Sequence, residues 1–390
     1  MWNNEYDVVI VGAGPAGTTA GRFAASKGAS VLILEKDRDV GYPVRCGEAI
    51  SLGGMKEFIE PNEKFIAAHI NKFSLTSPDK TEVILPLEEE GFVLERRVFD
   101  YELARLAANL GVKIITRAYV YGLIKENDKI AGVKFQYNGN DYQVKAKIVI
   151  GADGVESRVG RWGGLNTYTD FRDMESCVQV TAANIEIDPN TLYFYLGSEF
   201  APNGYLWVFP KGEKSANIGL GVSGMIGKKK SASAYLDDFL LNYFPNASIL
   251  TKIAGGVPCA TTYKQISAPG LMLVGDAAHQ VNPLSGGGIA SGMIGGKIAG
   301  LIVADAIKDN NLDLILSYDK AWDNRLGKRH VIFDKIKDGI YNFDDKKFNN
   351  IAHSFNKVPL NERSLGSLFK TALLNNPSLL IDIAKVFIIK

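Results

Sequence analysis

The 390-residue sequence predicts an α/β fold. In this fold a parallel-sheet domain is assembled from separated segments, an antiparallel sheet is inserted between them, and the C-terminal region is helical. Three observations support it: a strand, glycine turn, helix and strand open the chain; short strands fill residues 167–259; and an apolar strand followed by a Gly-rich helix comes at 271–296. A chain of this length has enough residues for one to three domains.

The first unit begins with the β-branched strand Tyr6–Val11 and ends with a second strand that closes on Glu35. A GxGxxG pattern alone is weak, but here it follows a strand, opens a helix and is followed 18 residues later by an acidic residue. Glycines let the backbone approach a pyrophosphate, and a carboxylate accepts from a ribose hydroxyl. We therefore predict dinucleotide binding rather than a purely structural turn. The turn residues are Gly12, Gly14, Ala16 and Gly17.

Residues 38–51 form a loop, followed by short strands near 72–76 and 82–85. Helical periodicity over 98–107 leads to a strand at 112–116, and two strands near 129–135 and 142–146 resemble a hairpin. Residues 147–151 enter a tight turn in which Asp153 braces the backbone. We assign residues 1–60, 93–165 and 265–330 to the nucleotide domain, 61–92 and 166–264 to a substrate domain, and 331–390 to a helical region.

The composition narrows the class of protein. With 44 basic and 43 acidic residues, the chain lacks the basic excess that nucleic acid binding requires. Three scattered cysteines predict neither a disulfide framework nor a metal site, and favour a reducing, cytoplasmic setting. We expect no signal peptide and no membrane span, because the longest uncharged run, Ala277–Gly296, is rich in glycine.

The combined motifs resemble a known superfamily. The GxGxxG unit with Glu35, the Gly-Ala-Asp-Gly turn at 151–154 and the Val-Gly-Asp-Ala-Ala-His element at 274–279 resemble the aromatic-hydroxylase superfamily of FAD proteins. The motif Tyr-x-Trp-x-Phe-Pro at 205–210, followed by Gly219-Leu-Gly221, is similar to the signature of geranylgeranyl reductases. Residues 43–48 (PVRCGE) resemble their cysteine-bearing loop. The likeness is greatest to archaeal digeranylgeranylglycerophospholipid reductases, which saturate the double bonds of membrane-lipid precursors.

This resemblance implies a Rossmann-like FAD domain of the aromatic-hydroxylase type with an inserted substrate domain. It places Asp276 at the ribityl or pyrophosphate part of FAD and the turn at Gly288 and Ile289 at the isoalloxazine ring. A helix opening there would direct its positive end at the flavin. The remaining residues that it implies for the cofactor are Cys46, Gly47, Ala49, Arg97 and Val120.

Saturating an isolated alkene requires a hydride on one carbon and a proton on the other. Cys46 is a candidate proton donor, or else a wall of the active site, with Glu48 and a bound water as other proton sources. His279 is better explained as a structural residue. Tyr205, Trp207 and Phe209 alternate along one strand and share a face, which is either an aromatic core or the floor of a prenyl tunnel.

The expected partners are a prenylated glycerophospholipid and an electron donor, either a ferredoxin-like carrier or NAD(P)H. Residues 376–390 predict an amphipathic helix that packs on the protein or contacts the inner face of the membrane. Two other functions stay open: an FAD-dependent hydroxylase or halogenase, and a prenyl-binding protein without catalysis. A reaction that requires oxygen would indicate the hydroxylase or halogenase. A purified protein that is colourless and holds no flavin would indicate the prenyl-binding protein.

Overall fold

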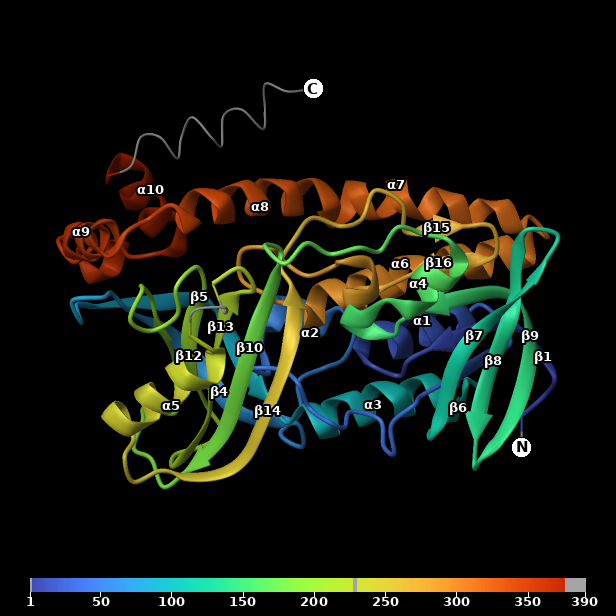
Figure 1. Cartoon of the computed structure of the whole chain (residues 1–390), viewed down its shortest axis with the longest axis horizontal. Helices are drawn as coiled ribbons and strands as arrows, with labels where there is room; N and C mark the ends of the chain where they lie inside the picture. Colours follow the sequence, from blue (N-terminus) through green and yellow to red (C-terminus); the bar gives the residue numbers. More distant parts are fainter. Residues whose placement is uncertain (1, 227–229, 376–390) are drawn as a thin grey trace.

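The computed structural model describes residues 2–226 and 230–375. Figure 1 shows an elongated molecule with one sheet near each end and long helices between and above them. The N-terminal sheet lies on the right of this view and the second sheet on the left.

The first sheet has the strand order β15-β16-β9-β1-β2-β6, and β8 and β7 extend it from β9. Its centre, from β16 to β6, is parallel. Apolar residues such as Val9, Ile10 and Ile33 are fully buried there, as expected for strands covered on both faces. The strands are β1 (Glu5–Val11), β2 (Val31–Leu34), β6 (Lys113–Ile115), β7 (Ala118–Glu126), β8 (Lys129–Tyr137), β9 (Asn140–Gly151), β15 (Ser267–Ala268) and β16 (Leu271–Leu273).

Three helices cover this sheet: α1 (Pro15–Ala25), α3 (Arg96–Ala108) and α6 (Ile289–Lys308). Among the described residues, α6 is the one helix long and apolar enough to cross a membrane, but 61% of that apolar window is buried. It packs along α1, so the fold accounts for its apolar character as that of a core helix. The chain also forms the short helices α2 (Leu52–Lys56), α4 (Arg158–Gly163), η1 (Gly154–Glu156) and η2 (Gly275–Ala278).

The second sheet has the order β14-β10-β13-β12-β11-β4-β5-β3 and is antiparallel except between β11 and β4. Helix α5 (Ala232–Tyr243) covers one face through a separate apolar core. β3 and the end of β5 pair in this sheet, although our sequence boundaries placed them in the first domain. The strands are β3 (Ala49–Ser51), β4 (Ile66–Thr76), β5 (Glu82–Leu94), β10 (Met174–Ala183), β11 (Thr191–Tyr195), β12 (Tyr205–Pro210), β13 (Ser215–Ser223) and β14 (Ser248–Pro258).

The last part of the described chain is helical. A long helix, α8 (Lys328–Tyr341), runs along the top of Figure 1 toward the second sheet and leads to α9 (Asp345–Phe355) and α10 (Leu365–Asn375). Ala352 and Phe355 of α9 pack on Val83 and Leu85 of β5. The expected helix at 376–390 lies outside the described residues. The other elements are η3 (Leu312–Ser317), α7 (Tyr318–Trp322), the π-helical turn η4 (Asp323–Gly327) and η5 (Leu360–Glu362).

Candidate active site

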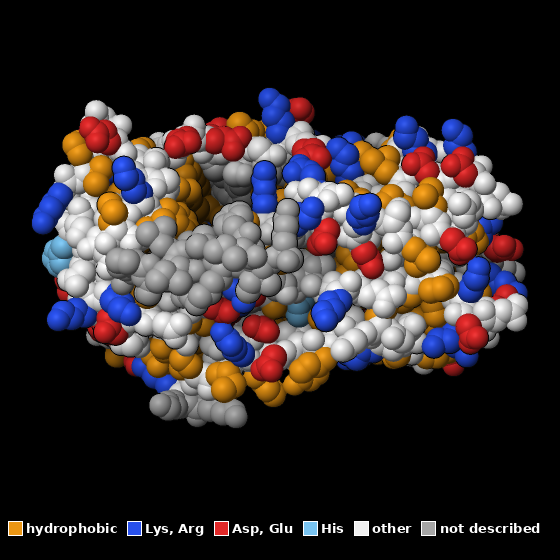
Figure 2. Space-filling view, turned by 90° about the horizontal axis from the view of Figure 1, so that it is seen from above, with side chains coloured by type: hydrophobic (Ala, Val, Ile, Leu, Met, Phe, Trp, Pro, Cys, Tyr) orange, Lys and Arg blue, Asp and Glu red, His pale blue; other side chains and the backbone are white. Residues whose placement is uncertain are grey.

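One cavity of about 920 Å³ connects the two sheets. It begins at Gly14 and Gly17, at the start of α1, and continues past the Cys46 loop and β12. It ends against α9 and α10, where Ala352 and Leu368 line it. Figure 2 shows a hollow with hydrophobic side chains in its wall, on the part of this face where α8 to α10 lie. A continuous space therefore joins the glycine turn to the C-terminal helices.

The glycine turn is built by close backbone contacts. Gly12 has φ +105°, and an added Cβ would lie 2.3 Å from the Ala152 carbonyl oxygen, while a Cβ on Gly17 would lie 2.1 Å from the Gly12 oxygen. Gly14 has no atom within 4 Å of an added Cβ and faces open space. Glu35 holds the turn, since its carboxylate accepts from the Ala13 N–H (2.7 Å) and the Asp37 N–H (2.9 Å). Burial raises the pKa of Glu35, against these two hydrogen bonds.

Asp276 and the start of α6 face the same end of the cavity. Burial raises the pKa of Asp276, and the nearby charge of Arg96 opposes this. Within the described residues, no group donates a hydrogen bond to its carboxylate. In the part of the chain that the structure describes, no side chain caps α6 after Gly288, so its first N–H groups stay available. A half-buried acceptor beside a positive helix end fits the hydroxyl groups and anionic ring of FAD.

The Cys46 loop packs directly against the aromatic strand β12. Its backbone carbonyl at Cys46 accepts from Gln179 Nε2 (2.9 Å), and the Gln179 oxygen accepts from Trp207 Nε1 (3.0 Å). An added Cβ on Gly47 would lie 2.9 Å from the Phe209 ring. Burial raises the pKa of the Cys46 thiol, although Arg96 and the Glu48 N–H act against the shift. The thiol is therefore protonated at neutral pH and lines the cavity.

Both carboxylate oxygens of Glu48 accept hydrogen bonds inside the protein. One carboxylate oxygen accepts from the Arg96 N–H (2.8 Å), and the other from Lys211 Nζ (2.8 Å) and Asn217 Nδ2 (2.5 Å). Its backbone has φ +74°, a left-handed conformation that costs energy for a residue with a side chain. We therefore propose that Glu48 positions the Cys46 loop and is not the proton source.

The structure distinguishes two neighbouring arginines. Arg96 lines the cavity, is nearly buried and forms a two-pronged pair with Asp100 at 2.7 and 2.8 Å. Arg97, which the resemblance implied for the cofactor, has an exposed side chain 3.6 Å from Asp39. The helical pattern could have distinguished the two arginines, because Arg96 lies on the same helix face as Phe99 and Asp100, which are buried. Arg96 is the better candidate for a flavin contact.

The aromatic residues of β12 form one wall. Tyr205, Trp207 and Phe209 all line the cavity, and the Tyr205 hydroxyl donates to the Ser285 carbonyl (2.6 Å). Phe194 packs edge-on against Phe209 with ring centroids 5.4 Å apart. The expected common face therefore borders the open space. Of the residues expected to bind the cofactor, the cavity brings together Gly14, Ala16, Gly17, Cys46, Gly47, Ala49, Asp276, Gly288 and Ile289; Gly12, Glu35, Arg97 and the buried Val120 of β7 lie outside its lining.

Sequence reasoning missed a polar group in the same cavity. Glu175 and Cys177 of β10, Cys259 after β14, and Lys337 and Tyr341 of α8 all line it. They come from segments up to 166 residues apart, so the sequence carries no local signal for their contact.

All three cysteines line this cavity, which predicts their reactivity. Burial raises the pKa of Cys46, raises that of Cys177 to about 12 and raises that of Cys259 well above its usual range. Since the thiolate is the nucleophile, we expect iodoacetamide to modify the native protein only slowly at pH 8 and all three thiols after denaturation. Mass spectrometry of both samples checks this; fast native labelling would contradict it.

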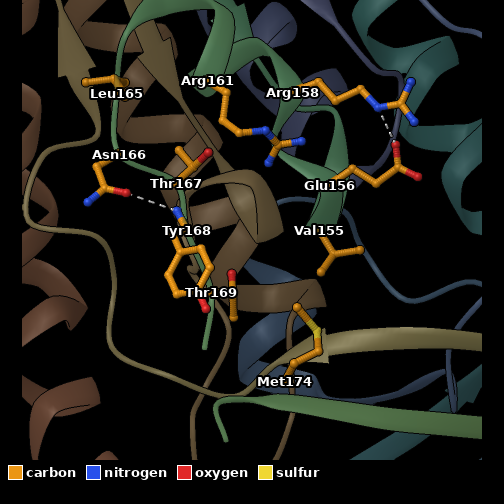
Figure 3. Close-up of a pocket in the computed structure, with 10 residues that line it drawn as sticks. All are labelled: Val155, Glu156, Arg158, Arg161, Leu165, Asn166, Thr167, Tyr168, Thr169 and Met174. Atoms are coloured by element: carbon orange, nitrogen blue, oxygen red, sulfur yellow. Dashed lines mark hydrogen bonds and ion pairs between the residues drawn. The ribbon is translucent and has the colours of Figure 1, made fainter. Parts of the chain in front are cut away.

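His279 belongs to a different region. Its Nε2 lies 2.7 Å from Thr169 Oγ1, and its ring lies against Tyr263 with centroids 3.9 Å apart and an interplanar angle of 32°. Burial lowers its pKa to about 4, so it is neutral. Thr169 also lines a second, polar pocket of about 560 Å³ around α4, in which Arg158 pairs with Glu156 (Figure 3). These contacts support a structural role for His279, which stays a prediction.

Comparisons with known proteins agree with this site. A family model for FAD-dependent oxidoreductases matches residues 7–203, and one for the geranylgeranyl reductase catalytic domain matches residues 173–257. Digeranylgeranylglycerophospholipid reductase from Methanocella arvoryzae is 42% identical over 97% of this chain and 98% of its own. A second reductase of that name, from Methanococcoides burtonii, is 41% identical over 98% and 96%.

Solved structures share the fold. A geranylgeranyl bacteriochlorophyll reductase-like protein from Thermoplasma acidophilum superposes with a TM-score of 0.93, at 36% identity over 98% of this chain and 99% of its own. A flavin-dependent brominase superposes with a TM-score of 0.74 at 19% identity over 98% of both chains, which shows the fold alone. On the full-length identities, the chain belongs to the geranylgeranyl reductase family of FAD-dependent oxidoreductases, among the digeranylgeranylglycerophospholipid reductases.

Proposed function

We propose that this protein is an FAD-dependent reductase that saturates the C=C bonds of geranylgeranyl chains in archaeal membrane-lipid precursors. The observation that carries this is one continuous cavity that begins at the glycine turn and continues between apolar walls to α9 and α10. Burying one methylene contributes about 0.8 kcal/mol, so a twenty-carbon chain gains at most roughly 15 kcal/mol before entropy losses. Only a long apolar surface can provide that.

Residues in different parts of this cavity would bind the cofactor and the lipid substrate. When bound, FAD would supply the hydride that reduces the alkene. Gly14 and Asp276 would hold its phosphate and hydroxyl groups, and the start of α6 would stabilise negative charge on its ring. The aromatic face of Tyr205, Trp207 and Phe209 would hold the chain and exclude water. Such a face also stabilises positive charge that develops at a substituted carbon.

We expect the purified protein to be yellow and its flavin spectrum to bleach with dithionite. Reduced protein mixed anaerobically with digeranylgeranylglyceryl phosphate should add two mass units for each saturated bond. Mass spectrometry of the lipid checks this. An unchanged lipid mass with several reductants would contradict the proposal, and a reaction that requires oxygen would favour the hydroxylase or halogenase alternative.

We further propose a cytoplasmic enzyme that meets its phospholipid substrate at the inner face of the membrane. Its electron donor is a ferredoxin-like carrier or NAD(P)H. A stopped-flow comparison of the two donors, followed by flavin bleaching, distinguishes them.

A further inference from the structure

Strand β10 presents three side chains to the cavity side of the second sheet. Gln179, Cys177 and Glu175 are two residues apart in turn, so they share one face at a spacing of roughly 7 Å. Gln179 binds the Cys46 loop and Trp207, and Cys177 and Glu175 line the cavity itself. The face therefore extends from the Cys46 loop to Glu175.

The carboxyl group of Glu175 is buried and only half satisfied. The residue is 6% exposed, and its Oε1 accepts a hydrogen bond from the Tyr341 hydroxyl of α8. Its Oε2 is buried and has no hydrogen-bond partner among the described residues. An unpartnered carboxylate oxygen in such a place is unfavourable, so a proton on Oε2 is favoured. Burial raises the pKa of Glu175 to about 7, although the Tyr341 hydrogen bond and the Lys337 charge oppose the shift.

Several other titratable groups surround Glu175. Lys337 is 2% exposed and is held by the Cys259 carbonyl (2.5 Å) and Asp334 (2.8 Å), with Asp173 at 3.6 Å. Burial raises the pKa of Tyr341, which lies beside Lys337, and also raises the pKa values of three weak acids that line the cavity. These other acids are Cys177, Cys259 and Tyr205.

Glu175 also belongs to the part of the cavity that borders the turn before α6. An added Cβ on Gly286 would lie 3.7 Å from the Tyr205 oxygen and 3.8 Å from Cys259 Sγ. On the other side, an added Cβ on Gly221 would lie 3.8 Å from Glu175 Oε2. Glu175 and the turn that we assign to the flavin ring thus line the same cavity.

We propose that Glu175 is the acid that protonates the substrate alkene, with Tyr341 and Lys337 as positioning residues; this rests on the proposed function. When bound, reduced FAD would supply the hydride that forms a C–H bond at one alkene carbon as the π bond breaks. The O–H bond at Glu175 Oε2 breaks, and its proton forms the C–H bond at the other carbon. The carboxylate that remains is stabilised by the Tyr341 hydroxyl and the Lys337 charge, and solvent hydronium reprotonates it.

Glu175 suits this step better than Cys46. A thiol is a weaker acid than a carboxylic acid, and burial raises the pKa of the Cys46 thiol further, because it disfavours the thiolate that proton donation would leave. Both sites offer a hydrogen-bond donor and a cation, the Glu48 N–H and Arg96 at Cys46, and Tyr341 and Lys337 at Glu175, so the difference lies in acid strength: a carboxylic acid releases its proton more readily than a thiol. Cys46 then forms the wall of the cavity at the other end of the β10 face.

The test uses dithionite-reduced holoenzyme and digeranylgeranylglyceryl phosphate in anaerobic single turnovers across a pH series. General acid catalysis contributes typically 10²- to 10⁴-fold, so we expect Glu175→Gln to slow saturation by at least about 10²-fold. Wild-type rates should be flat below pH 7 and fall above it, since the acid form is then lost; Glu175→Gln should lose this descending limb. Visible absorbance should show unchanged FAD content.

Tyr341→Phe separates a catalytic from a structural role of Glu175. Removing a hydrogen bond that lowers the pKa of Glu175 should move the descending limb to higher pH while the rate stays within about tenfold of wild type. Glu126→Gln, in an exposed pair with Lys145, is the matched control and should change neither rate nor profile. Flavin-loaded Glu175→Gln with the wild-type rate and profile would overturn the inference. A wild-type enzyme that saturates no bond would instead contradict the proposed function.

Discussion

Lys211→Met is expected to lower the free energy of unfolding by about 3 kcal/mol, because it leaves a buried carboxylate without its cation. The Lys211 side chain is 8% exposed and the Glu48 side chain 6%, and Lys211 Nζ also donates to the Leu94 carbonyl (2.5 Å) and contacts Glu95 (2.9 Å). Glu48 in turn holds the left-handed backbone of the cysteine loop. Urea unfolding followed by circular dichroism measures the effect, and flavin fluorescence should report earlier release of FAD.

Two further variants test whether the loss of stability in Lys211→Met comes from the unpaired charge of Glu48. Lys145→Met removes a cation from an exposed pair with Glu126, and exposed pairs contribute little, so its unfolding midpoint should match wild type. Adding Glu48→Gln to Lys211→Met removes the unpaired charge, so the double variant should be more stable than Lys211→Met alone. Equal stability of wild type and Lys211→Met would mean that Asn217 and the Arg96 N–H suffice to hold Glu48.

The first βαβ unit shows what local pattern can predict. The strand expected at Tyr6–Val11 is β1, and the glycine turn, α1 and β2 follow in the expected order. These elements depend on short-range rules: glycine where the backbone turns closely, and apolar runs where strands are buried. The common face of Tyr205 and Phe209 was predictable for the same reason, since alternation along a strand is a local property.

What sequence could not supply is contact between distant segments. Glu48 looked like a possible acid because its partners Lys211 and Asn217 lie more than 160 residues away. The Glu175 and Tyr341 pair joins β10 to α8 across a similar separation. The choice between Arg96 and Arg97 was different: it depends on where α3 begins, and helix ends are the least certain part of a sequence prediction.

The second large effect is expected at the end of the cavity that lies against α9 and α10, and it concerns the length of the lipid chain that the enzyme accepts. Ala352 of α9 lines the cavity and is 6% exposed, so Ala352→Phe would fill space that we assign to the end of the lipid chain. Excluding one five-carbon unit costs roughly 4 kcal/mol of apolar burial, or about 10³-fold in kcat/KM for a twenty-carbon chain. Five- and ten-carbon prenyl alcohols, which leave this end empty, should be reduced as by wild type.

The comparison of chain lengths separates a blocked tunnel from a damaged enzyme. Asn350→Phe puts the same ring on the exposed side of α9 and should leave both long and short substrates unaffected. If Ala352→Phe lowered the rates for all chain lengths equally, the distal wall would be acting through stability rather than through substrate length. A selective loss for the long chain, with FAD content and short-chain rates unchanged, is what a cavity running from the flavin to α9 requires, because only a chain that reaches α9 can meet the added ring.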